Sequence, residues 1–402
     1  MFNSIGAKYE IFAHSEYLRM MTDINIFTKI RGIYGWRCLT NKEHAKKARN
    51  LIYKHISDNC SYKAVVKKII KQALEFHAAT PCSSHDVYDD PTEALYIAAH
   101  LCQKYSIEDS KLVLEVVQTA ISCTGNHDRW FEFLDPLAFS CELENNLYPI
   151  YNQSNAATTV VTKEQLNALE YFLTHCSGIV VRTNHGAIAN ILGLNETAVA
   201  SRWSDVAFID APLSSCRNCN PLLLACQAES PEGVRLLLRY GAQPMFPVYS
   251  FSDPSGQQRF PLQVLAMKLN ASVFWKTHIH AIESNYREEF MRQRKAYDMQ
   301  INECINAFQT ALPTLPLRPC QQLTQDHMGS SSTLFCVHPS YKSSLPRSIT
   351  HGPRTLRHIA KCTVRNTLSR NNGNAIISIP KKIQQLPLPI LIKEYIDLQI
   401  DL

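Results

Sequence analysis

The chain has 402 residues, of which 45% are hydrophobic, and its formal net charge at neutral pH is +6. A chain of this length and apolar content can bury a core and form one large or several ordinary domains, which excludes disorder along its whole length. Its first residues include acids and polar side chains where a secretory signal needs an apolar run, and no stretch is apolar for the length of a membrane span. We therefore expect a cytoplasmic protein, and an additional nuclear fraction is compatible with the sequence.

Fourteen cysteines are scattered singly along the chain from Cys38 to Cys362. A short secreted protein with this many cysteines would be built on disulfides, but a long chain without an export signal keeps its thiols reduced. We therefore expect most of these cysteines to be buried free thiols.

Residues 1–89 are predicted to form a helical N-terminal region. Within it, residues 41–56 carry basic side chains on one helix face and an apolar set on the other, which comprises Ala48, Leu51, Ile52 and His55. One basic helix without interleaved aromatic residues is more often a solvated face than a nucleic-acid site. We therefore predict an exposed surface helix.

A pattern of paired helices begins at Asp90. Asp90 is placed to cap a helix and Pro91 to occupy its first turn, and residues 108–121 then repeat apolar side chains at helical spacing. Farther along, Thr162 and Gln165 have the spacing of a capping box, which predicts another helix start.

The clearest helix pair begins at Asn220. Asn220 followed by Pro221, and Ser230 followed by Pro231, each have the cap and first-turn residues of a helix, and Gly241 is placed to end the second helix. The sequence therefore predicts two short helices joined by a tight turn.

This pair resembles an ankyrin repeat. The family's Thr-Pro-Leu-His-x-Ala opening corresponds to the run from Asn220 to Ala225, and the family's ending corresponds to LLLRYGA, although the family's threonine and histidine are replaced. Comparable prolines lie 45, 85 and 40 residues apart, at Pro91, Pro136, Pro221 and Pro261, instead of the roughly 33 of a regular array. The resemblance implies degenerate ankyrin-like repeats over residues 90–311, with residues 220–243 as the best copy. An irregular helical domain with one chance ankyrin-like pair is the alternative.

A long helix and a linker are predicted to follow. Residues 282–308 carry apolar side chains at helical intervals and predict a long polar helix that closes the stack. Residues 312–345 are rich in proline and serine and lack periodicity, which predicts a linker. We therefore place a domain boundary near residue 345 and a separate module over residues 346–402.

Residues able to perform catalysis occur singly, not as constellations. Cys216 and Cys219 form one C-x-x-C pair, but a zinc site needs four ligands and no second pair completes it. No phosphate-binding loop, nucleophile elbow or zinc-protease motif occurs. We therefore expect no catalytic site, no metal and no cofactor. A zinc-dependent or nucleic-acid-binding protein that uses these cysteines and the basic C-terminal segment is kept as a third hypothesis.

The C-terminal segment has an unusual charge distribution. No acidic residue occurs between Asp326 and Glu394, whereas ten lysines and arginines do. After Gly352 and Pro353, a helix is predicted with Arg357, Lys361, Arg365 and Arg370 on one face, and an apolar stripe on the other face that comprises Leu356, Ile359, Ala360, Val364 and Leu368. Two further short helices follow, the last after a proline-kinked turn. So small a unit buries little surface, so the apolar stripe should pack on the helical stack or bind a partner.

Residues 346–398 resemble a SOCS box. Thr355, Leu356 and Val364 match the family's first helix, which binds elongin C, and Leu386-Pro387-Leu388-Pro389 matches the motif that selects cullin-five, with Tyr395 downstream. The resemblance implies elongin C contacts at Leu356, Ile359, Ala360, Val364 and Leu368, and cullin contacts at Leu386, Pro387, Leu388 and Pro389. Ala360 stands where the family has a cysteine, which would weaken elongin C binding by about 1 to 2 kcal/mol if the pocket does not close around it.

The two resemblances together imply an all-α member of the ankyrin-repeat and SOCS-box protein family. Such a chain is a substrate receptor: its helical domain holds an unidentified target protein, and its three-helix SOCS box recruits elongin B, elongin C and cullin-five with its RING subunit. The ubiquitin chemistry then belongs to the partners, and no nucleic-acid or membrane binding is expected. The second hypothesis is an ankyrin-type scaffold that recruits no ligase.

Overall fold

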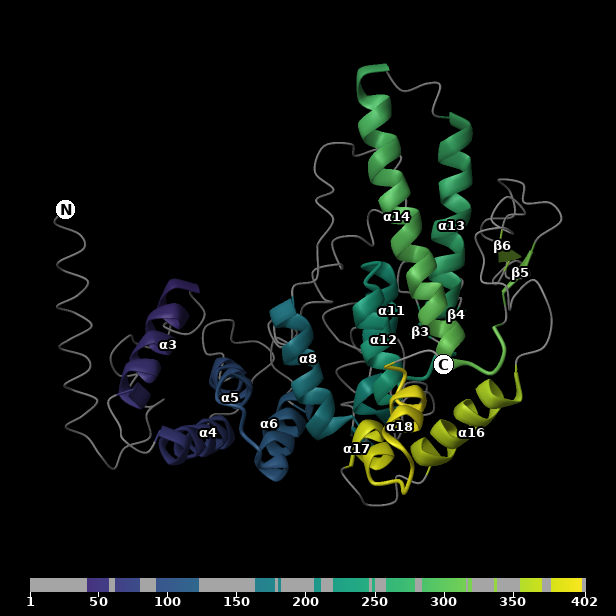
Figure 1. Cartoon of the computed structure of the whole chain (residues 1–402). Helices are drawn as coiled ribbons and strands as arrows, with labels where there is room; N and C mark the ends of the chain where they lie inside the picture. The colour runs from purple at the N-terminus through teal and green to yellow at the C-terminus, as the bar shows by residue number, and fades with distance from the viewer. Residues whose placement is uncertain are drawn as a thin grey trace. The chain divides into compact units, whose positions relative to one another are not determined.

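The structure is a computed structural model of the whole chain. It describes residues 42–57, 62–79, 92–122, 163–177, 180–181, 206–210, 220–245, 248–249, 258–278, 284–315, 317–319, 336–337, 355–370 and 377–399. These residues are overwhelmingly helical (Figure 1), and their strands are only two residues long, so the predicted all-α fold class is confirmed. Among them, no helix combines the length and apolarity that a membrane crossing requires.

The chain divides into two compact units. Unit 1 comprises residues 1–133 and 181–205, and unit 2 comprises residues 134–180 and 206–402. The domain boundaries predicted from the sequence are drawn differently and stay predictions.

Unit 1 is a small helical assembly around one central helix. Its described helices are α3 (Lys42–Ser57), α4 (Tyr62–Ala79), α5 (Thr92–Lys104) and α6 (Ser110–Ser122). Helix α4 packs against α3, α5 and α6. The buried apolar residues of this unit include Leu51, Ile52, Ile56, Val66, Ile69, Ile70, Ala73, Leu95, Leu101, Val113 and Val116.

Unit 2 contains the predicted helix pair. It begins in the described range with α8 (Lys163–Cys176), whose start agrees with the predicted capping box. The pair itself is α11 (Pro221–Gln227) and α12 (Pro231–Tyr240). The short elements between α8 and the pair are β1 (Val180–Val181), β2 (Val206–Ala207) and the 3₁₀ turn η3 (Phe208–Asp210).

The caps predicted for this pair are confirmed. The Asn220 side chain accepts a hydrogen bond from the Leu223 backbone N–H at 2.8 Å, and the Ser230 hydroxyl oxygen accepts one from the Gly233 N–H at 3.1 Å. Gly241 ends α12 with a left-handed φ of 99°, a conformation that side chains with a Cβ rarely adopt. The local chemistry of the sequence therefore defines both ends of this motif.

Two long helices extend the stack. Helix α13 (Pro261–His278) packs against α11, and α14 (Ser284–Ala311) packs along α12 and α13, as Figure 1 shows. Strands β3 (Val248–Tyr249) and β4 (Gln258–Arg259) pair antiparallel before them, and β5 (Arg318–Pro319) and β6 (Cys336–Val337) pair in parallel after them. The buried apolar side chains here include Leu222, Leu224, Val234, Leu237, Leu265, Leu269, Ile301, Ile305 and Phe308.

Three short helices complete unit 2. They are α16 (Leu356–Arg370), α17 (Ile379–Gln384) and α18 (Ile390–Ile396), which agrees with the three helices predicted for this segment. All three contact one another, and α17 also packs against α12 (Figure 1). The C-terminal helices are therefore built onto the stack through α12.

Candidate docking surface on the C-terminal helices

Helix α16 turns its polar face inward and part of its apolar face outward. The side chains of Lys361 and Arg365 are only 3% and 6% exposed, whereas Leu356 is 82% exposed and Ile359 is 40% exposed. This orientation is the reverse of an ordinary surface helix, which buries its apolar stripe and leaves its charges in water. The buried charges of α16 therefore need hydrogen-bond acceptors in the interior, and its exposed apolar side chains are available to another protein.

The polar partners of α16 are the ends of other helices. The Arg365 guanidinium donates to the Leu238 and Arg239 carbonyls at 2.7 and 2.8 Å, and to the Ile396 carbonyl at 2.9 Å. These carbonyls belong to the last turns of α12 and α18, where a helix lacks internal donors and carries partial negative charge. Burial lowers the pKa of Arg365 to about 10, and the nearby Asp397 carboxylate opposes this effect, so the guanidinium stays charged at neutral pH.

Helix α14 ends against the same face of α16. The His358 ring donates from Nε2 to the Leu312 carbonyl at 2.7 Å, and the Cys362 thiol donates to the Ala311 carbonyl at 3.5 Å. One face of α16 thus supplies donors to the C-terminal ends of both α12 and α14. This explains why a face with charged and polar side chains is the buried one.

An ion-pair network joins α8, α12 and α18 beside Arg365. Arg239 lies 2.8 Å from the Asp397 carboxylate and 2.9 Å from the Glu170 carboxylate, and Asp397 is fully buried. The Tyr240 and Thr174 hydroxyls are 2.8 Å apart in the same region. A buried carboxylate with a close guanidinium partner is costly to separate, so this network fixes α18 against α12 and α8.

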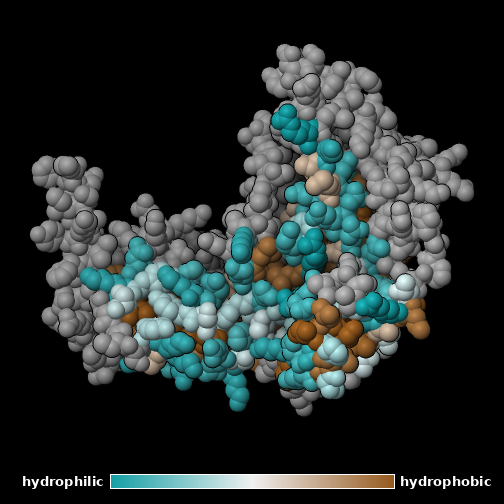
Figure 2. All heavy atoms as spheres, in the orientation of Figure 1, coloured by the Kyte–Doolittle hydropathy of each residue, from teal (hydrophilic) through white to brown (hydrophobic). Residues whose placement is uncertain are grey.

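The predicted elongin C contacts fall into two groups. Leu356, Ile359 and Ala360 are exposed on the first turns of α16, where Figure 2 shows a hydrophobic patch at the outer end of this helix. Val364 and Leu368 are instead partly buried. Together with Ile392, they pack against an apolar cluster that consists of Ile379, Ile383 and Ile396. The predicted stripe is therefore shared between an open surface and the internal core of the three helices.

The predicted cullin contacts form a second exposed surface. Pro387, Leu388 and Pro389 are exposed and Leu386 is partly buried in the turn that precedes α18. Ile390 and Leu391 continue it onto α18 with 60% and 57% exposure. Figure 2 shows hydrophobic atoms gathered over α17 and α18.

Tyr395 is held inside the three-helix unit. Its ring is buried, and the Lys361 ammonium and the Arg357 guanidinium lie 4.3 and 4.9 Å from the ring centroid. These cation–π contacts attach α18 to the basic face of α16. The sequence did not indicate this role, because the contact joins residues on different helices.

Two other predicted features cannot be placed. Cys216 and Cys219, like the start of the predicted helix at Gly352 and Pro353, lie outside the described residues. Within the described ranges, no group of three or more histidine, cysteine or acidic side chains is arranged to hold a metal ion. Cys102, Cys176, Cys226, Cys304 and Cys362 are buried thiols outside any disulfide, as expected.

Comparison with known proteins identifies the C-terminal segment. Residues 352–397 match the family model of the SOCS box. No curated protein and no solved structure matches the chain. The match does not reach residues 90–311, whose ankyrin-like character stays a prediction. The segment that contains α16, α17 and α18 is therefore a SOCS box, the module of ubiquitin-ligase adaptors that binds elongins and a cullin.

Proposed function

We propose that the chain is the substrate-recognition subunit of an elongin–cullin–SOCS-box ubiquitin ligase. In this proposal the helices that precede the SOCS box bind a target protein, and the SOCS box recruits elongin B, elongin C and cullin-five with its RING subunit. The observation that carries the proposal is the reversed orientation of α16, which leaves Leu356 82% exposed inside a segment that matches the SOCS box.

Leu356, Ile359 and Ala360 are the proposed contact with elongin C. They lie on successive turns at one end of α16, which suits docking of a helix into an apolar groove. Burial of one exposed leucine side chain contributes about 1.5 to 3 kcal/mol, so Leu356 can dominate this contact. Ala360 is exposed beside them but adds little apolar area.

Leu386, Pro387, Leu388 and Pro389 are the proposed contact with cullin-five. The two prolines restrict the backbone of this turn, and the Leu388 N–H donates to the Leu386 carbonyl at 2.8 Å. A segment held rigid before binding loses less conformational entropy when it docks. The exposed Leu388 side chain is then available to a partner in a fixed position.

The chain would contribute proximity and no bond chemistry of its own. A target held on the helical region and a ligase held on the SOCS box are tethered to each other, which raises their effective concentration. The hydrogen bonds and ion pair that attach the SOCS box to α12 through Arg365 and Arg239 support this role, because they join the recruiting helices to the helical stack.

The proposal is tested by a capture experiment. The tagged full chain is mixed with elongin B, elongin C, cullin-five and its RING subunit, and the proteins that it retains are identified. The native chain should retain all four proteins. The double substitution Leu386→Ala/Pro387→Ala should lose cullin-five and keep the elongins, because the α16 surface is untouched.

The matched control is Gln384→Ala/Gln385→Ala, which changes two exposed neighbours and should retain every partner. If the native chain retains no elongin C, the ligase proposal is wrong. The scaffold hypothesis, which the replacement of the family cysteine by Ala360 favours, would then take its place.

A further inference from the structure

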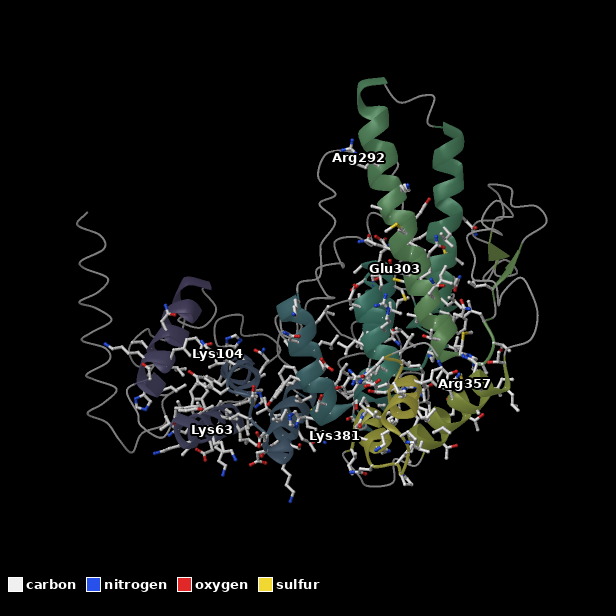
Figure 3. The ribbon with its side chains drawn as sticks, viewed as in Figure 1. Lys63, Lys104, Arg292, Glu303, Arg357 and Lys381 are labelled. Carbon is white, nitrogen blue, oxygen red and sulfur yellow. The ribbon has the colours of Figure 1, made fainter. Side chains whose placement is uncertain are left out.

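Helix α4 of unit 1 has a basic face that the proposed ligase role does not use. Lys63, Lys67 and Lys71 are exposed and recur every four residues, and the exposed Lys68 lies three residues before Lys71, so the four lysines lie on one side of the helix. The opposite side is the buried one that packs against α3, α5 and α6. Figure 3 labels Lys63 on α4.

The positive charge of this face has little internal compensation. Lys67 lies 3.3 Å from Asp109, the residue that caps α6, and both side chains are about half exposed. Within the described part of the chain, no ion pair involves Lys63, Lys68 or Lys71. Over α3 and α4 together the sequence has nine lysines and arginines and only two acids. Clustered like charges raise the local potential and attract an anionic partner.

The surroundings of the lysines favour a protein partner over nucleic acid or a membrane. Tyr62 is 47% exposed beside Lys63, and it is the only exposed large hydrophobic side chain among the described residues of unit 1. One ring does not provide the series of stacking platforms that single-stranded nucleic acids use, and a membrane-binding helix needs several bulky apolar anchors. Lysine ammonium groups act as point charges and bind single carboxylates without a fixed fork geometry.

We propose that this basic face binds an acidic segment of the target protein. The inference rests on the proposed function, because it assigns the target class of that ligase subunit. Lys63 and Lys71 are separated by about 12 Å along the helix, which an extended peptide spans with about four residues. The segment recognised would therefore carry several glutamates or aspartates within a short extended stretch, and Tyr62 would contact an adjacent apolar side chain.

Fluorescence anisotropy with a labelled polyglutamate peptide and the full chain tests the inference. The native chain should bind the peptide, and binding should weaken as salt concentration rises. The variant Lys68→Glu/Lys71→Glu should bind about tenfold more weakly, because two attractive charges become repulsive. It leaves Lys67 and its contact with Asp109 unchanged.

Arg292→Glu/Lys295→Glu is the matched control. It makes the same charge change at the same spacing on the exposed side of α14 (Figure 3) and should bind the peptide like the native chain. The inference would be overturned if the native chain did not bind the peptide, or if both variants lost peptide binding equally. It would also be overturned if the native chain bound a single-stranded oligonucleotide or phosphatidylserine vesicles more tightly than the peptide. Capture of elongin C is measured with the same protein samples. If the native chain captures no elongin C, the proposed function is refuted. If the native chain captures elongin C but does not bind the peptide, only the acidic-segment inference is refuted.

Discussion

Arg365 shows how one buried charge can decide the orientation of a helix. Its guanidinium satisfies three carbonyls, of which Leu238 and Arg239 lie more than 120 positions away in the sequence. The sequence predicted the amphipathic pattern of α16 but placed Arg365 on a basic face opposite the docking stripe. No local rule could show that this face is buried, because the carbonyls that require donors belong to distant helices.

Substitution of Arg365 should loosen the SOCS box from the stack. Arg365→Met keeps the approximate length of the side chain but removes the donor to the Arg239 and Ile396 carbonyls, at a cost of about 2 to 4 kcal/mol. Faster amide hydrogen exchange in α16, α17 and α18 would report the loss. Arg235→Met on α12 is the control, since Arg235 is half exposed and its pairing with Glu303 at 3.7 Å contributes little. Equal exchange in the two variants would contradict a structural role for Arg365.

A buried carboxyl should make the stability of unit 2 depend on pH. Burial raises the pKa of Asp210 to about 7, although the Gln243 N–H donates to its carboxylate at 2.8 Å and opposes the shift. The unfolded carboxyl has a pKa of about 3.9, so the folded state binds the proton more tightly. Stability should therefore fall as pH rises from about 4 to about 7 and then level off.

Asp210→Asn should reduce this pH dependence. The amide oxygen can still accept a hydrogen bond from the Gln243 N–H, but the side chain no longer ionises. The variant should therefore be more stable than the native chain at pH 8, and this difference in stability should be much smaller at pH 5. Hydrogen exchange of the η3 and α12 amides, corrected for the intrinsic rate at each pH, measures this. An equal difference between the two proteins at both pH values would contradict the assignment to Asp210.

At the scale of the element, the helix ends were predictable and their packing was not. Asn220, Ser230 and Gly241 occupy the cap positions that the sequence indicated, because capping depends on neighbours within a few residues. No local pattern indicated that Gly241 also contacts α17. A Cβ built at this glycine would lie 2.5 Å from the Cδ1 atom of Ile379.

Gly241→Ala should therefore destabilise the contact between α12 and α17. The alanine would adopt an unfavourable left-handed backbone conformation, and its Cβ would collide with Ile379. Together these effects should lower the free energy of unfolding by about 1 to 3 kcal/mol. Ile379→Val removes the colliding methyl group, so the double variant should lose less stability than the two single variants predict together. Thermal melting of the four proteins tests this coupling. Strict additivity would show that Gly241 and Ile379 do not interact.

At the scale of the whole molecule, recognition and recruitment are assigned to different surfaces. The proposed recruiting surface lies on α16 and the turn before α18, and the proposed acidic-segment site lies on α4. The SOCS box was predictable because two short motifs occur in the right order and spacing, and the family match to residues 352–397 confirms it. The target region was not predictable in this way, because binding surfaces on helical repeats depend on side chains that no backbone signal requires.

The central claim is that the exposed end of α16 seats in elongin C. Isothermal titration of the elongin B–elongin C complex with the full chain measures this contact directly. The native chain and the control Asn366→Asp, which adds the same charge at an exposed position on the same helix, should bind alike. Leu356→Asp should weaken binding by at least about thirtyfold, since it replaces about 2 kcal/mol or more of apolar burial with a desolvated charge. Equal affinity of Leu356→Asp and the native chain, or no binding by the native chain, would contradict the account.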